Sequence, residues 1–366
     1  MRMRRRGVSS VAVVGVIALA AIVVAVGIFS LTPGPKSTTT SSATSAISAT
    51  TTLAPLITFN ADAYTAEVQA LLNGFSAATA VPVAPTHPAG SFALAKQIVS
   101  GSQVDVFIPV ALSAAAPSNL GNLSSNWAIG FASDQMVIAY SNASISTPAA
   151  ATVISGYQRA AKSNASSDWN AMFASLTSGG VKVGISDPNA DPAGLRGWLV
   201  LEAAGALYGN SSQSYTAPLL QAQANVTGSA AANMVAPMQA GQMQFLFIYK
   251  SVAIAQHLGY FQLDHRVNLG DPKLAASYAL LKYTLAEGPT TGAPIILCMT
   301  IPVNAPDATE AMQFVQYVVK DSAGVLTPYG LQAFNPPLLF DNTAPPAFVA
   351  DMLSQGAIAQ GGSLGA

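Results

Sequence analysis

The sequence predicts an α/β fold with two lobes and mainly parallel sheets, preceded by a membrane-spanning segment and a polar stalk. From about residue 55 onward, short apolar runs alternate with helix-like patterns, which is typical of the α/β class. No internal repeat is visible, and no Pro/Gly-rich linker divides the middle of the chain. Two lobes joined by crossing strands therefore fit better than two independent domains on a string.

The N-terminus has the pattern of a membrane anchor. Four arginines within the first six residues precede an apolar run from Val8 to about Leu31. The run is long enough to span the hydrocarbon core of a bilayer and too long for a typical signal-peptide core. The preceding arginines place the N-terminus in the cytoplasm. We therefore expect residues 1–33 to form a single-pass anchor in the cell membrane, with the C-terminal part extracellular; cleavage after this segment is the alternative.

The segment after the anchor predicts a flexible linker over residues 34–54. Of the 16 residues from 37 to 52, 12 are Ser or Thr, a composition that gives no hydrophobic core. Five Asn-x-Ser/Thr sequons lie beyond it and fit an exported glycoprotein. They are at Asn122, Asn142, Asn164, Asn210 and Asn225.

Charge argues against nucleic acid as a partner. Five of the 15 basic residues precede residue 37, so the exported part carries ten basic residues against all 16 acidic ones. Its formal net charge is therefore about −6, which opposes binding to a phosphate backbone.

The sequence contains a single cysteine, Cys298, so no intrachain disulfide can form. We expect Cys298 to be a small, buried, apolar residue.

Short apolar runs predict the strands, and apolar residues at helical spacing predict the helices. One helix is expected over residues 64–79 and another over 305–324, where Met312, Val315, Val318 and Val319 share a face. The expected strands are 55–61, 104–112, 134–141, 181–187, 244–251 and 294–303.

The stretch "SDPNADPAGLRGWLV", residues 186–200, predicts a helix start. Asp191 suits the N-cap because its carboxylate accepts free amide hydrogens, and Pro192 suits the first helical position because it needs no donor there. Gly209 is a suitable stop for this helix. Its free amides and the positive end of its dipole would favour an anion, although an ordinary capped helix explains the same residues.

No motif indicates an enzyme, a metal site or a cofactor. His87, His257 and His265 lack metal-ligand spacing, and neither a nucleophile elbow nor a phosphate-binding glycine loop is present. We therefore expect a binding protein with no cofactor.

Four blocks of sequence resemble the extracellular solute-binding proteins of ABC importers, specifically the archaeal tungstate/molybdate-binding family. They are "WAIGFASDQMVIAYS", "VGISDPNADPAGLRGWLVLEAAGALYG", "FLFIYKSVAIAQHLGYFQLDHRVNLGDPK" and "TIPVNAPDATEAMQFVQYV". The resemblance implies a type II periplasmic-binding-protein-like fold, in which two α/β lobes hold a ligand in the cleft between them. It implies a first lobe of residues 55–140 and 295–366 and a second lobe of residues 141–294.

The family's ligand residues are only partly retained. The Asp-Pro-x-Gly helix start survives as Asp191–Gly194, but Asp62 and Ala63 stand where the family has Gly-Ser, and Pro109 stands where it has Ser. Ile248 replaces a family Glu, with Tyr249 following as in the family. Asp62 would place a negative charge beside an anion unless it is protonated or paired. The expected ligand-binding residues are Asn60, Asp62, Ala63, Pro109, Asp191, Ala193, Gly194, Arg196 and Tyr249.

The sequence therefore predicts a monomeric substrate-binding protein that delivers a small oxyanion of the tungstate/molybdate kind to an ABC permease in the membrane. Hinge closure of the lobes would trap the ligand. One alternative is a diverged binding protein for a different small solute, for which Asp62 would be attractive. Another is a cell-surface protein that uses the fold without transport.

Overall fold

A computed structural model describes residues 53–286 and 288–365 of the chain. These belong to one compact unit that begins at Thr52. The expected anchor and almost all of the Ser/Thr-rich linker lie outside the described residues. Within the described ranges, no helix combines the length and apolar character that crossing a membrane requires.

The first lobe begins with a small parallel sheet that the sequence anticipates. Strand β1 (Thr58–Ala61) pairs in parallel with β2 (His87–Ala89) on one side and with β3 (Val106–Ile108) on the other. The helices that follow these strands cover the sheet, and their apolar faces are buried. They are α1 (Thr65–Thr79), α2 (Ser91–Val99), α3 (Leu112–Ala115) and α4 (Pro117–Leu120).

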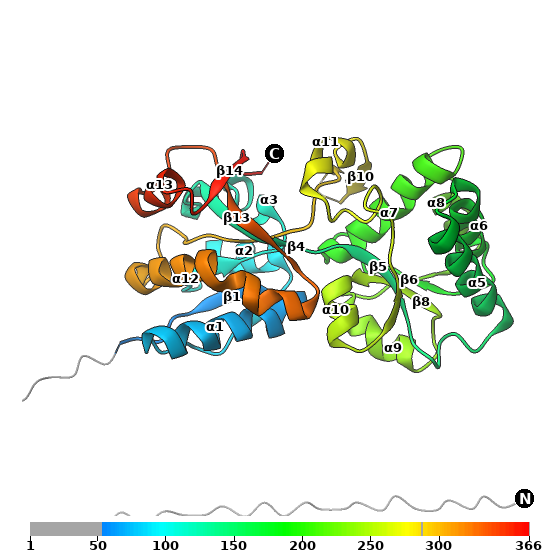
Figure 1. The fold of residues 1–366 in the computed structure, drawn as a ribbon, viewed down its shortest axis with the longest axis horizontal. Helices are drawn as coiled ribbons and strands as arrows, with labels where there is room; N and C mark the ends of the chain where they lie inside the picture. Colours follow the sequence, from blue (N-terminus) through cyan, green and yellow to red (C-terminus); the bar gives the residue numbers. More distant parts are fainter. Residues whose placement is uncertain (1–52, 287, 366) are drawn as a thin grey trace, which may run out of the picture. The chain divides into compact units, whose positions relative to one another are not determined.

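A second sheet completes this lobe, in the strand order β12-β4-β13-β14. Backbone hydrogen bonds between Phe107 and Thr300, both 2.9 Å, connect it to β3. Helices α12 (Ala308–Leu326) and α13 (Ala347–Ser354) belong to the same lobe (Figure 1). The strands are β4 (Trp127–Ser133), β12 (Ile296–Met299), β13 (Gln332–Asp341) and β14 (Ala359–Gly362).

The second lobe is built on a five-stranded sheet with the order β7-β6-β8-β5-β9. Its strands are β5 (Met136–Tyr140), β6 (Val183–Gly184), β7 (Asn225–Val226), β8 (Phe245–Tyr249) and β9 (Gly259–Phe261). Its helices are α5 (Pro148–Ser163), α6 (Ser166–Thr177), α7 (Pro192–Tyr208), α8 (Thr216–Gln221), α9 (Val235–Gln239) and α10 (Lys250–Ala255).

The chain passes between the lobes where β4 runs into β5 through Asp134 and Gln135 (Figure 1). It returns from Leu269 to β12 by way of the short helix α11 (Ala275–Tyr278) and the hairpin of β10 (Lys282–Leu285) and β11 (Gly288–Thr291). The amide of Asp134 donates to the carbonyl of Ile295 at 3.2 Å, and the amide of Ile295 donates to Leu269 at 2.8 Å. The crossing segments therefore lie side by side and form the hinge.

The prediction of mainly parallel sheets is wrong, because the four-stranded and five-stranded sheets are mixed. β4 pairs antiparallel with β12 and β13, and β5 pairs antiparallel with β8 and β9. The hinge explains one of these pairs: β4 leads out of the first lobe and β12 leads back into it, so the two neighbouring strands run in opposite directions. Local hydrophobic patterning carries no information about this reversal.

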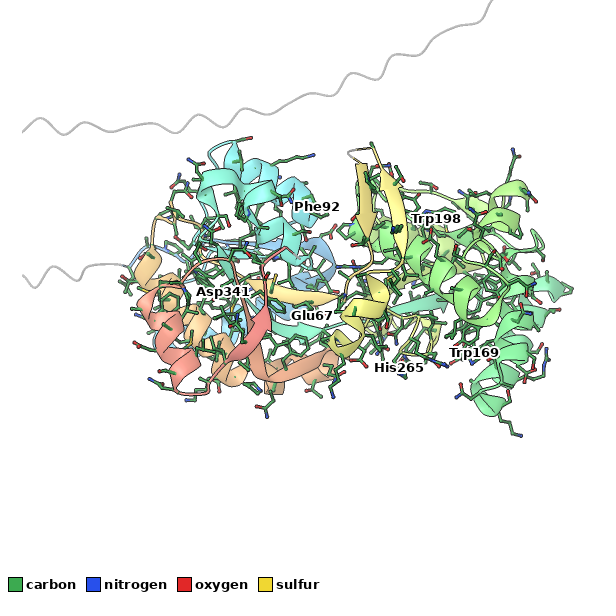
Figure 2. All side chains as sticks on the ribbon, turned by 90° about the horizontal axis from the view of Figure 1, so that it is seen from above. Glu67, Phe92, Trp169, Trp198, His265 and Asp341 are labelled. Atoms are coloured by element: carbon green, nitrogen blue, oxygen red, sulfur yellow. The ribbon has the colours of Figure 1, made fainter. Side chains whose placement is uncertain are left out.

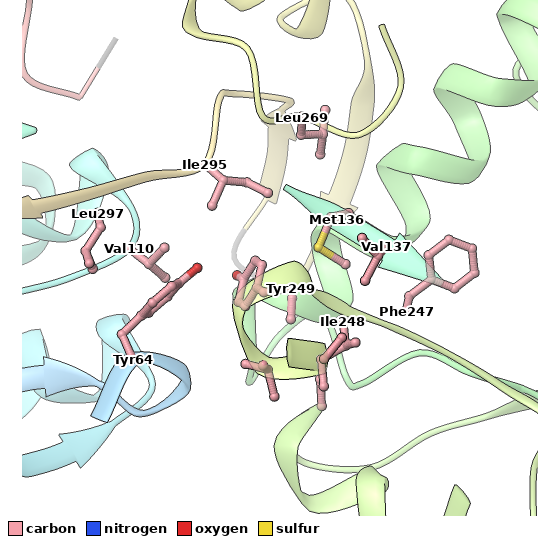
Figure 3. Packing of buried hydrophobic residues seen from close by; sticks show 14 of the residues in the cluster. Tyr64, Val110, Met136, Val137, Phe247, Ile248, Tyr249, Leu269, Ile295 and Leu297 are labelled. Carbon is pink, nitrogen blue, oxygen red and sulfur yellow. The ribbon is translucent and has the colours of Figure 1, made fainter. Parts of the chain in front are cut away.

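One continuous apolar core runs through the hinge. It contains Tyr64 and Val110 of the first lobe, Met136 of the hinge strand, and Phe247 and Ile248 of the second lobe. Figure 3 shows these side chains from both lobes, with the Tyr64 ring directed towards Tyr249. Because both lobes share this core, its packing sets their relative orientation.

Four of the five sequon asparagines are exposed, and Asn225 is half-buried. Asn164 has φ +52° and ends α5 in the left-handed region, which asparagine tolerates better than most residues. The sequons lie on both lobes and are spread along the sequence. Their exposure is compatible with the predicted glycosylation.

Candidate functional site

The helix start at Asp191 forms as the sequence predicts. α7 runs from Pro192 to Tyr208, with Asp191 as N-cap and Gly209 as C-cap. One carboxylate oxygen of Asp191 accepts from the amide of Ala193 at 2.9 Å. The other accepts from the amide of Ala231 at 2.7 Å, so this side chain holds two backbone segments together.

Only glycine fits at position 194, because the backbone at Ser186 lies too close for a side chain. A Cβ at this position would lie 2.1 Å from the carbonyl oxygen of Ser186. The first turn of α7 therefore packs directly on the segment that leaves β6. The amide of Gly194 donates to the backbone oxygen of Asp191 at 3.0 Å. The amides of Ala193 and Gly194 are thus both engaged by Asp191.

Arg196 lies one turn further along α7 and connects the lobes. It is only 6% exposed, and its Nη2 donates to the carbonyl oxygen of Val110 in the first lobe at 2.7 Å. Its Nη1 donates to the hydroxyl of Tyr249 at the end of β8. No carboxylate lies within ion-pair distance of Arg196 in the part of the chain that the structure describes. A buried cation without a neutralising partner in a cleft favours an anionic ligand.

The acceptor for Arg196 is positioned by the end of β3. The hydroxyl of Ser91, the first residue of α2, accepts from the amide of Val110 at 3.1 Å. The carbonyl of Pro109 accepts from the amide of Cys298 on β12 at 3.0 Å. Pro109 is buried and contributes this carbonyl to the sheet.

A small cavity brings together five of the predicted residues: Asp62 and Ala63 of the first lobe, and Asp191, Ala193 and Tyr249 of the second. Its volume is about 10 Å³, enough for roughly one water molecule. Ile248, at the position of the family Glu, also lines it, as do Val252 and residues 230–232. The pKa of Asp62 is raised by desolvation in the cleft and then by the nearby Asp191.

Asn60 is fully buried and is not among the residues that line this cavity. Its side-chain amide donates to the carbonyl of Ala61 at 3.0 Å and to the hydroxyl of Thr65 at 3.4 Å. It therefore supports the turn that presents Asp62.

A buried polar cluster at the hinge was not identified from the sequence. Oδ2 of Asp134 accepts from the hydroxyl of Tyr64 at 3.1 Å and from that of Ser251 at 2.6 Å. Oδ1 accepts from the amide of Gln135 at 2.7 Å. Burial raises the pKa of Asp134. The sequence does contain one signal for this cluster, because Asp134 is the only carboxylate within the apolar stretch "WAIGFASDQMVIAY".

A larger groove of about 1050 Å³ lies beside the hinge. Arg196 and Asp134 line it from the interior, and Phe334 and Phe340 of β13 line it from the first lobe. Asn268 and Asp271 also line it. Arg196 is therefore reached from this groove, while its partner Tyr249 faces the small cavity.

The remaining polar residues noted in the sequence lie elsewhere. His87, His257 and His265 are exposed and do not meet. Asp264 and Arg266 form a bidentate pair, with hydrogen bonds of 2.9 and 2.7 Å, and this arginine lowers the pKa of Asp264.

The arrangement of two α/β lobes about a hinge agrees with the comparisons. A family model described as "Bacterial extracellular solute-binding protein" matches residues 58–332. The chain belongs to this family of extracellular solute-binding proteins. Members are binding components of transporters rather than enzymes, which agrees with the expectation from the sequence.

Among relatives of this solute-binding protein, one from Sulfurisphaera tokodaii is 37% identical over 321 residues, covering 85% of this chain and 84% of the relative. It is described as a solute-binding protein. The molybdate/tungstate-binding protein WtpA of Thermococcus kodakarensis is 30% identical over 183 residues, covering 44% of this chain and 52% of WtpA. The resemblance seen in the sequence is confirmed.

Solved structures show the same fold. The periplasmic molybdate-binding protein of Azotobacter vinelandii has a TM-score of 0.53 at 15% identity and covers 77% of this chain and 99% of its own. The sulfate-binding protein SubI of Mycobacterium tuberculosis also has a TM-score of 0.53, at 12% identity, and covers 85% of this chain and 93% of its own. This solute-binding protein therefore has the mixed α/β architecture of type II periplasmic binding proteins.

Proposed function

We propose that this solute-binding protein captures a small oxyanion of the molybdate/tungstate kind between its lobes and delivers it to an ABC permease. The observation that carries the proposal is Arg196. A guanidinium has five N–H donors. Here one N–H donates to Tyr249 and one to Val110, and the described structure supplies no carboxylate for the charge. The remaining donors suit the oxygens of a bound anion.

The site is assembled from both lobes, as closure around a ligand requires. Asp62 and Ala63 approach from the first lobe, while Ala193 and Tyr249 approach from the second. The cavity between them, at about 10 Å³, is smaller than a tetrahedral oxyanion. Arg196 does not line this cavity in the closed arrangement, because Tyr249, to which it donates, lies between them. Entry of an anion therefore requires the lobes to separate at the hinge, which also frees Arg196 from Val110 so that it can turn to the ligand.

The position of the site suggests how the protein works in its cell. We place the described residues outside the membrane, tethered by the predicted anchor of residues 1–33 and the linker that follows. A monomer then delivers its ligand to the permease after each closure. The names of WtpA and of the structural neighbours support an oxyanion for those proteins.

A second candidate ligand is an organic anion with an apolar body. The groove of about 1050 Å³ has the size of a site for a larger solute, and its lining includes Arg196 and two phenylalanines of β13. A carboxylate on such a solute would pair with Arg196 while its body contacts Phe334 and Phe340.

Titration calorimetry on the full chain tests the proposal, with molybdate, tungstate, sulfate and phosphate as probes and a panel of aromatic carboxylates beside them. We expect at least one oxyanion to bind and Arg196→Met to weaken that binding at least tenfold. Arg159→Met, on the exposed side of α5, serves as the matched control and should leave binding unchanged. Binding of carboxylates alone would favour the second candidate, and binding of no anion would contradict the proposed function.

A further inference from the structure

Two carboxylates from opposite lobes face the same small cavity. Asp62 belongs to the turn after β1, and its Oδ1 accepts from the amide of Ala63 at 2.8 Å. Asp191 caps α7 across the cleft, with both oxygens held by backbone amides. Both side chains line the cavity of about 10 Å³. Closure of the lobes thus brings two negative groups together at the place proposed for an anion.

The two carboxylates differ in their partners. Both carboxyl oxygens of Asp191 are already occupied, because each accepts a hydrogen bond from a backbone amide. Asp62 is exposed, and its Oδ2 has no hydrogen-bond partner among the described residues. Of the two, only Asp62 has a carboxyl oxygen open to a ligand or a proton.

The charged and titratable groups around Asp62 do not neutralise it. Tyr249 lines the cavity as a neutral phenol, because burial holds its pKa far above the ordinary range. Arg196 lies beyond Tyr249 and donates to it. Lys250 begins α10, which packs against the turn of Asp62, yet it makes no ion pair with Asp62 in the described structure.

Two further acidic groups lie on the first-lobe side. Tyr64, in the same turn as Asp62, donates to Asp134 of the hinge. Glu67 follows on α1 and is buried. Neither supplies positive charge, and no cation pairs with Asp62 among the described residues, so an anion beside it is repelled by the Asp62 carboxylate unless that group is protonated.

We propose, on the basis of the proposed function, that Asp62 takes up a proton from solvent when the oxyanion binds and then donates a hydrogen bond to it. The carboxylic acid would serve as the hydroxyl donor that an anion needs, and the repulsion from Asp191 would fall because Asp62 is neutral. Release of the anion returns the proton to solvent. Binding is therefore coupled to one proton, and acidic medium strengthens capture.

Calorimetry across a pH series tests this coupling in the full chain. Molybdate is the first probe, and sulfate is the second because its own charge stays constant over the range used. Where Asp62 is ionised in the free protein, Kd should rise about tenfold for each pH unit, and titrations in two buffers of different ionisation enthalpy should show uptake of about one proton.

The variants separate the role of the proton from that of the side chain. Asp62→Asn places a permanent neutral donor at this position, so we expect it to bind at high pH about as tightly as the wild type binds at low pH, with proton uptake close to zero. Asp62→Ala should lose the pH dependence and also bind more weakly than Asp62→Asn. Asp351→Asn, on the exposed face of α13, is the matched control and should keep the wild-type pH profile.

The failure of this inference is distinct from failure of the proposed function. If the wild type binds an oxyanion with the same Kd at every pH and no proton uptake, the coupling is wrong while the function stands. If Asp62→Asn binds less tightly than the wild type at every pH, the charged form is needed and the proton-donor role is overturned. If neither protein binds any oxyanion, both proposals fall together.

Discussion

The hydroxyl of Tyr64 donates a hydrogen bond of 3.1 Å to Oδ2 of Asp134, where the chain crosses from the first lobe to the second. The same oxygen accepts from Ser251 of α10 at 2.6 Å. Asp134 thus receives one hydroxyl from each side of the hinge. Because this carboxylate is only 3% exposed, its partners compensate for the loss of water around it.

Removing the Tyr64 hydroxyl should weaken this hinge contact without removing the ring. For Tyr64→Phe we expect the free energy of unfolding to fall by about 1–2 kcal/mol, since a buried charged acceptor loses one of its donors. Urea unfolding measures the change. Tyr329→Phe is the control, because the Tyr329 hydroxyl has no hydrogen-bond partner among the described residues. Equal effects of the two substitutions would contradict a special role for the contact with Asp134.

Glu67 should make the protein less stable as pH rises from about 4.5 to about 7. It is 1% exposed on α1 (Figure 2), its Oε1 has no partner within the described ranges, and burial raises its pKa to about 7. The folded chain therefore binds this proton more tightly than the unfolded chain, whose carboxyl titrates near 4.5. The contribution of the Glu67 proton to the free energy of unfolding is fully present below about pH 4.5, and it declines as pH rises from there to about 7.

Glu67→Gln removes this titration. At about pH 8 we expect the variant to be more stable than the wild type by about 1–3 kcal/mol, given about 1.4 kcal/mol per unit of pKa shift. At about pH 4 the two proteins should differ little, because the wild-type carboxyl is then neutral in both states. Unfolding measured across this range, with exposed Asp321→Asn as control, checks the sign. A wild-type protein that gains stability as pH rises from 5 to 7 through Glu67 would refute the assignment.

Asp191 should be less replaceable than an ordinary N-cap. As a simple cap it would tolerate Asn, which caps helices about as well as Asp. In the structure, however, its second oxygen also accepts a hydrogen bond, from the amide of Ala231. Asn has only one side-chain oxygen, so one of the two amides loses its acceptor.

For Asp191→Asn we therefore expect a loss of about 1–2 kcal/mol in unfolding free energy, and for Asp191→Ala a loss of about 2–4 kcal/mol, because both amides are then unpaired. Thermal and urea unfolding without ligand measure these effects. An Asp191→Asn variant as stable as the wild type would show that the bond to Ala231 contributes nothing.

The sequence predicted α7 closely because its signals are local. Asp191, Pro192 and Gly209 act within a turn of the helix ends, and the structure places all three where they were expected. The fold family was also predicted, since whole blocks of sequence carry it. β13 (Gln332–Asp341) was not predicted: it contains Asn335, Pro336 and Pro337, and proline normally argues against a strand.

The buried polar cluster at the hinge was not predicted, for a different reason. Tyr64 lies 70 residues before Asp134, and Ser251 lies 117 residues after it, so only the three-dimensional fold brings them together. The same holds for Arg196, which the sequence marks as a candidate cation but whose acceptor, the carbonyl of Val110, has no side-chain signature. Local patterns identify helix ends well, whereas contacts made between lobes depend on how the sheets are arranged.

Gly194 offers a sharp test of how closely α7 packs on the segment after β6. Ala is favoured over Gly inside a helix by about 1 kcal/mol, so Gly→Ala stabilises a helix wherever space allows. At Gly194 the added Cβ would lie 2.1 Å from the carbonyl oxygen of Ser186, and backbone would have to move. At Gly324, inside α12, nothing lies within 4 Å of the added Cβ.

We therefore expect Gly194→Ala to lower the free energy of unfolding by at least about 2 kcal/mol and Gly324→Ala to raise it by up to about 1 kcal/mol. The two substitutions are chemically identical, so helix propensity cancels in the comparison and the difference reports the contact with Ser186. Because a shift of α7 also displaces Arg196, Gly194→Ala should in addition weaken anion binding, which Gly324→Ala should leave intact. A Gly194→Ala protein as stable as Gly324→Ala would mean that the start of α7 stands further from Ser186 than the structure places it.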